Sequence, residues 1–144
     1  MTCSTIHVCI RCKLASSKRR EGYETHGLQL RDALIDALEG AGLASRFRIA
    51  ETACLGGCNR RCRISIADPA RWSWLLADLR PDEQDAGQII RFLEEWLAAE
   101  DGLIPKTERS AWLVSHAIGR MPPLLPDPQQ GKSEDDGTKE TTTT

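Results

Sequence analysis

The sequence lacks a long apolar run, and it lacks the residue sets that mark common catalytic sites. None of its 144 residues lie in a stretch close to the roughly 18 apolar residues that a membrane-spanning helix needs. The N-terminus has no basic segment followed by an apolar run, so we expect no secretory signal and a cytoplasmic location. No Ser/His/Asp set, phosphate-binding loop or pair of carboxylates stands out, and we therefore expect no enzymatic activity.

Aromatic residues are also scarce, at 5 % of the chain, and they are little interleaved with basic residues. This composition argues against nucleic-acid binding. The net charge of −2 conceals an uneven distribution, because residues 1–71 contain twelve Lys and Arg against seven Asp and Glu. Residues 72–144 contain seven Lys and Arg against fourteen Asp and Glu. The basic half also contains all the cysteines, and nearby positive charge favours the thiolate form of cysteine.

Six cysteines are the chemically distinctive feature, and five of them form two tight groups. The groups and the outlier are Cys9 with Cys12, then Cys54 with Cys58 and Cys62, and Cys3 alone. Such spacings are typical of a metal or iron–sulfur centre, or of redox-active dithiols. Because cytoplasmic thiols are usually kept reduced, we interpret these groups as ligands rather than as a disulfide framework.

Hydrophobic periodicity predicts an α/β domain over residues 1–121, followed by a disordered tail over residues 122–144 that contains four prolines. We expect strands and helices in the order β-α-β-β-β-α and then a further short helix. Their approximate ranges are 5–10, 27–39, 46–53, 64–67, 72–76, 81–101 and 108–118. This is the element order of a thioredoxin-like fold with a mixed four-stranded sheet.

The predicted fold brings the two cysteine groups together. A strand–helix–strand unit makes its two strands parallel or near neighbours. Cys9 and Cys54 follow the first and the second strand, so their strand ends should lie at the same edge of the sheet. Zinc and iron remain alternatives at this point. A dithiol oxidoreductase is a secondary interpretation, because the residues from Lys13 onward are predicted to form a loop rather than a helix.

Several segments resemble a bacterial family of predicted metal-binding proteins, domain of unknown function 1636. The resemblance covers about residues 5–123, and the segment from Cys54 to Ala67 is its most specific part. The other segments are Val8–Cys12, Arg71–Trp74, Asp78–Pro81, Asp101–Gly102 with Pro105, and Gly119–Pro123. This family is similar to the thioredoxin-like 2Fe–2S ferredoxins, which transfer single electrons between a reductase and an acceptor enzyme.

The resemblance implies a set of cluster ligands. Cys9 matches the first ligand of those ferredoxins, and Cys54 with Cys58 matches their paired ligands after the second strand. The chain departs from the pattern at the second ligand, because no cysteine lies between Lys13 and Ala53. Cys12 is the nearest substitute and Cys62 is the other candidate, so the ligand set implied is Cys9, Cys12, Cys54 and Cys58, with Cys62 adjacent.

Other interpretations stay open beside this one. The chain could be a zinc-binding or other metal-binding protein, or a redox sensor in which Cys9 and Cys12 cycle between dithiol and disulfide. A homodimer is also compatible with the sequence. We interpret Cys3 as a bystander and His7 and His116 as surface residues, and we assign His26 a polar role at the start of a helix. The basic residues Arg60, Arg61 and Arg63 border the predicted site and could contact an acidic partner.

Overall fold

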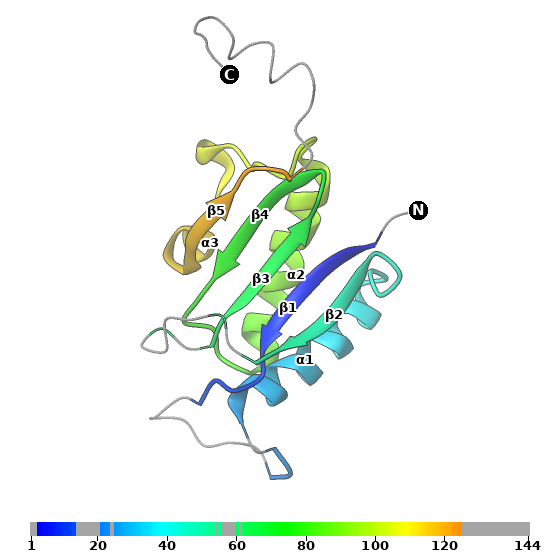
Figure 1. Cartoon of the computed structure of the whole chain (residues 1–144), viewed down its shortest axis with the longest axis vertical. Coiled ribbons are helices and arrows are strands. Elements are labelled where there is room, and N and C mark those ends of the chain that lie inside the picture. The colour runs from blue at the N-terminus through cyan, green and yellow to red at the C-terminus, as the bar shows by residue number, and fades with distance from the viewer. Residues whose placement is uncertain are drawn as a thin grey trace, which may run out of the picture.

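The computed structural model describes residues 3–13, 21–23, 25–53, 55, 60 and 62–124. These residues form a mixed α/β fold, in which a five-stranded sheet is accompanied by three α-helices and one 3-10 turn (Figure 1). In chain order the elements are β1 (Ser4–Cys9), α1 (His26–Gly40), β2 (Phe47–Thr52), β3 (Ile64–Asp68), β4 (Arg71–Leu76), α2 (Glu83–Ala98), η1 (Lys106–Glu108), α3 (Ala111–His116) and β5 (Ala117–Met121).

The strands lie in the order β2-β1-β3-β4-β5. β1 and β2 are parallel and are joined through α1, as the sequence predicted, and all other neighbours are antiparallel. The predicted count of four strands is wrong, because β5 occupies the end of the range expected to be helical. α3 ends where the Ala117 N–H donates to the Leu113 carbonyl, and the chain then pairs with β4.

Local signals explain where the two long helices begin and end. The Thr25 side chain caps α1 by accepting the Leu28 N–H, and the Asp82 side chain caps α2 by accepting the Asp85 N–H. After α1 the chain turns at Gly42, whose φ of +74° favours glycine. Both helices lie on the same face of the sheet (Figure 1). They cover the alternate apolar residues of the central strands, which are fully buried: Ile6, Val8, Ile64 and Ile66.

Aromatic side chains fill the core under β4 and α2, in a region that we call the aromatic corner (Arg71, Trp74, Phe92, Trp96 and Gly102). The rings of Trp74 and Phe92 meet edge to face at 5.4 Å. Both indole N–H groups find backbone acceptors, because Trp74 donates to the Gly102 carbonyl at 2.8 Å and Trp96 to the Trp72 carbonyl at 2.9 Å. Both buried indoles are therefore packed and hydrogen-bonded within the chain itself.

Part of the predicted organisation lies outside the described residues. Of the predicted tail, only residues 122–124 are described, and the predicted loop at 13–25 is described only at residues 13, 21–23 and 25. In the part of the chain that the structure describes, no helix has the length and apolar character needed to cross a membrane.

Candidate functional site

The ends of three strands meet at one edge of the sheet, which we call the cysteine edge (residues 9–13, 51–53, 55 and 62–63). Cys9 is the last residue of β1 and lies opposite Thr52, the last residue of β2. The Cys9 N–H also donates to the Arg63 carbonyl at 3.2 Å, just before β3 begins. Parallel pairing of β1 with β2 thus places the segments that follow them at a common edge, as the sequence predicted.

The thiols of Cys9 and Cys12 are buried together at this edge, with 5 % and 8 % of their surfaces exposed. They hydrogen-bond to each other, and the Cys9 Sγ also lies 3.9 Å from the Ala53 carbonyl oxygen. Burial raises the pKa of Cys9 above its ordinary value, and Cys12 adds to this effect. Hydrogen bonds from the backbone of Arg11 and Leu55 act in the opposite direction and favour the thiolate.

The N-terminus of α1 packs directly on the Cys9–Cys12 loop. The Thr25 hydroxyl donates to the Ile10 carbonyl, and the Gly27 N–H donates to the Cys12 carbonyl at 3.0 Å. A Cβ atom at Gly27 would lie 2.0 Å from the Cys9 carbonyl oxygen, so this close approach requires glycine. This contact was not predicted from the sequence. The signal available for it was a glycine in the first turn of the helix that follows the cysteine pair.

The other cysteines are placed unequally. Cys62 is fully buried, and its backbone exchanges two hydrogen bonds of 3.2 Å with Leu79, the third residue after β4. Cys54 and Cys58 lie outside the described residues. Cys3 is exposed and precedes β1, at the opposite end of that strand from Cys9. Within the described residues no three or more His, Cys, Asp or Glu side chains form a group that could hold a metal ion, so Cys62 does not complete such a group with Cys9 and Cys12.

Basic residues border the cysteine edge. Arg60 forms an ion pair with Asp78, which raises the pKa of Arg60, and both side chains are about 40 % exposed (39 % and 43 %). Arg63 is buried beside the start of β3, whereas Arg11 and Lys13 are exposed. Arg61 lies outside the described residues. The Arg60 pair is solvent-exposed, so we assign it little stabilising effect.

The three histidines differ from one another in their surroundings. His7 on β1 is partly buried, and its Nδ1 lies 3.4 Å from the Thr52 hydroxyl. His26 is buried at the start of α1, which is a more enclosed position than the sequence indicated. His116 ends α3, where its ring stacks on Trp112 at 4.4 Å.

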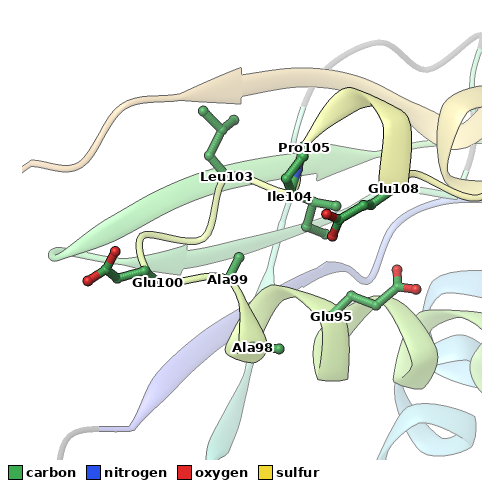
Figure 2. A pocket seen from close by; sticks show the side chains of 8 residues that line it. All are labelled: Glu95, Ala98, Ala99, Glu100, Leu103, Ile104, Pro105 and Glu108. Atoms are coloured by element: carbon green, nitrogen blue, oxygen red, sulfur yellow. The ribbon is translucent and has the colours of Figure 1, made fainter.

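Two grooves lie away from the cysteines. Figure 2 shows one of about 320 Å³ at the C-terminal end of α2, where Glu95 from α2 and Glu108 from η1 extend into the same space. A second groove of about 500 Å³ runs between α1 and α2 and is lined by four carboxylates (Asp32, Asp36, Asp82 and Glu83). Among the described residues that line them, neither groove contains a cysteine or a histidine. Neither groove therefore adds a thiol or an imidazole to the cysteine edge.

Comparison with protein families finds one match, over residues 6–123, to a family described as protein of unknown function (DUF1636). Curated proteins and solved structures give no match.

Proposed function

The chain belongs to the DUF1636 family, and we propose that it binds a 2Fe–2S cluster and carries single electrons between a reductase and an acceptor enzyme in the cytoplasm. The proposed ligands are Cys9, Cys12, Cys54 and Cys58. The family match itself assigns no function, so the proposal depends on the chemistry of the cysteine edge.

The observation that carries the proposal is the position of the Cys9 thiol. It contacts the Ala53 carbonyl and receives a hydrogen bond from the backbone of Leu55, and these are the two residues covalently joined to Cys54. The same thiol hydrogen-bonds to Cys12. Residues 44 positions apart in the chain are thus neighbours here. This contact supports a site that draws ligands from both cysteine groups.

The donor set suits an iron–sulfur cluster, which takes cysteine thiolates as ligands. When bound, the cluster supplies the one-electron chemistry. The chain's own contribution is a site from which water is largely excluded, since Cys9 and Cys12 are buried. Backbone hydrogen bonds from Arg11 and Leu55 favour the thiolate of Cys9, and such bonds to sulfur also tune reduction potential. The exposed Arg11 at this edge adds positive charge that would offset an anionic cluster, whereas the charge of Arg60 is already paired with Asp78.

The order of the elements supports a thioredoxin-like core for this site. β1, α1, β2, β3, β4 and α2 follow the order expected of that fold, and η1, α3 and β5 are additions after it. The parallel pair β1–β2 supplies the shared edge on which the proposal depends.

A second candidate is a dithiol redox sensor, and the hydrogen bond between the Cys9 and Cys12 thiols favours it. In this alternative the two thiols would be oxidised to a disulfide by a low-molecular-weight disulfide, which would accept the two electrons and two protons and be reduced to two thiols. The structure supports it less well, because the first N–H groups of α1 donate to the Cys12 carbonyl and to the Thr25 side chain rather than to a thiol. A helix N-terminus placed at the attacking cysteine is one usual means of lowering its pKa, whereas the pKa of Cys9 is raised.

Single Cys→Ser variants, purified without oxygen, test the proposed ligands. We expect Cys54→Ser to reduce bound iron and sulfide to less than about a tenth of the parent value, because each thiolate ligand is required. Cys3→Ser is the matched control and should retain full occupancy. Unchanged iron in Cys54→Ser would refute the site. Stoichiometric zinc in the parent would favour a zinc protein, and metal-free protein with a reversible Cys9–Cys12 disulfide would favour the sensor.

A further inference from the structure

Two arginines lie over a single tryptophan at the aromatic corner. The Cζ atoms of Arg109 and Arg120 are 5.3 Å and 5.1 Å from the centre of the Trp74 ring, which is only 1 % exposed. Arg109 follows η1, whereas Arg120 lies on β5 directly opposite Trp74 in the strand register. Segments far apart in the chain from Trp74 thus place two guanidinium groups over one buried ring.

In the described part of the chain, neither guanidinium is neutralised by a carboxylate. Other arginines in that part are neutralised in this way. Arg31, Arg60, Arg80 and Arg91 each form an ion pair. Arg109 instead donates from Nε to the Ile104 carbonyl at 2.9 Å, so its terminal nitrogens have no acceptor among the described residues. Glu108, its neighbour in sequence, lines the groove of Figure 2.

The two positive charges also repel each other. Burial lowers the pKa of Arg109, and the charge of Arg120 lowers it further. Stacking on Trp74 fixes both groups near this ring, but it does not cancel their repulsion. An anion placed between or beside them would do so, and it would occupy the free donors of both side chains.

We propose that Arg109 and Arg120 bind an oxyanion, either a phosphate or a carboxylate group, at the rim of Trp74. Arginine presents planar, paired N–H donors that match the oxygens of these groups, and aromatic stacking holds it in place for that purpose. This site involves none of the cysteines, and the proposal does not depend on the proposed electron transfer.

Isothermal titration of the full chain with inorganic phosphate, and separately with citrate, tests this proposal at constant ionic strength. We expect saturable binding of one anion per chain and at least a tenfold loss of affinity in Arg120→Gln. Arg120 is exposed, so this variant should fold normally, as its circular dichroism spectrum would show. Arg91→Gln is the matched control, because Arg91 is an exposed arginine on α2. It should bind as the parent does.

The comparison of phosphate with citrate shows which kind of oxyanion the site binds. Binding of phosphate alone would assign a phosphate ligand, and binding of citrate alone would assign a carboxylate ligand, with Arg120→Lys expected to retain part of either affinity. The proposal is overturned if neither anion gives saturable heat. It is equally overturned if Arg120→Gln and Arg91→Gln lose affinity to the same extent, since the effect would then be one of overall charge.

Discussion

The cysteine edge and the aromatic corner both contain buried side chains, yet these satisfy their polar groups in different ways. At the aromatic corner the Arg71 guanidinium donates to the Trp96 and Ala99 carbonyls at 2.9 Å and 2.8 Å, and both indoles have short backbone bonds. At the cysteine edge the Cys9 thiol has only weak sulfur contacts, such as the one of 3.9 Å to Ala53. The Arg71 and indole donors of the first region have short bonds to carbonyls of the chain, whereas the second region contains weakly bonded thiols.

This difference indicates that the strongest internal packing and the proposed thiol chemistry reside in separate parts of the fold. Aromatic burial and strong hydrogen bonds stabilise the aromatic corner without a ligand. Metal binding would replace the thiol protons at the cysteine edge, so that region would gain stability only when loaded. Substitutions in the two regions should therefore affect unfolding and metal content independently.

Trp96→Ala should have the largest effect on stability. Trp96 is fully buried against Phe47 and Arg71, and removal of a buried Trp side chain costs about 3–5 kcal/mol. Urea unfolding of metal-free and metal-loaded protein should show the same loss in both forms. Val114→Ala, at an exposed position of α3, should change the free energy of unfolding by less than about 0.5 kcal/mol. A Trp96→Ala protein that stays folded but loses its metal would contradict the separation.

Gly27→Ala should affect both properties, because α1 meets the cysteine edge at this residue. The added Cβ collides with the Cys9 carbonyl, so we expect a loss of about 1–3 kcal/mol and reduced metal content. Gly87→Ala is the control, since a Cβ in the interior of α2 meets nothing within 4 Å there. Its better helix propensity should stabilise the protein by about 0.5–1 kcal/mol. Parent-like metal content and stability in Gly27→Ala would show that this contact is unimportant.

Gly27 and Gly87 differ in a contact between distant segments, and contacts of this kind separate what the sequence predicts from what it does not. Hydrophobic periodicity predicted β1 to β4, α1 and α2, because the spacing of apolar residues indicates which side of an element is buried. Ile64 and Ile66, which alternate along β3, are an example. The prediction that β1 and β2 end at the same edge of the sheet followed from the helix that joins them. β5 was missed because its pairing with β4, opposite Trp74 at Arg120, is a contact between distant segments. The Gly27 contact with Cys9 was missed for the same reason.

The smallest effect concerns pH. The pKa of Cys9 in the folded protein lies above its ordinary value of 9.0, so the folded state retains a proton that the unfolded state loses. The contribution of Cys9 to the stability of metal-free protein should therefore be constant below pH 9.0 and should fall as the pH rises through the raised pKa, by at most about 1.4 kcal/mol per pH unit. Urea midpoints in the presence of a reductant would measure this slope.

Cys9→Ser should reduce the slope, because it removes the buried thiol, and Cys3→Ser should preserve it, because Cys3 is exposed. An identical slope in the parent and in Cys9→Ser would mean that Cys9 does not titrate in this way.

The iron and acid-labile sulfide content of the native chain, purified without oxygen, tests the central claim most directly. A cluster at the cysteine edge predicts two iron and two sulfide ions per chain, together with visible absorbance that dithionite bleaches. Protein that contains neither iron nor sulfide, whether it carries zinc or no metal, would contradict the account.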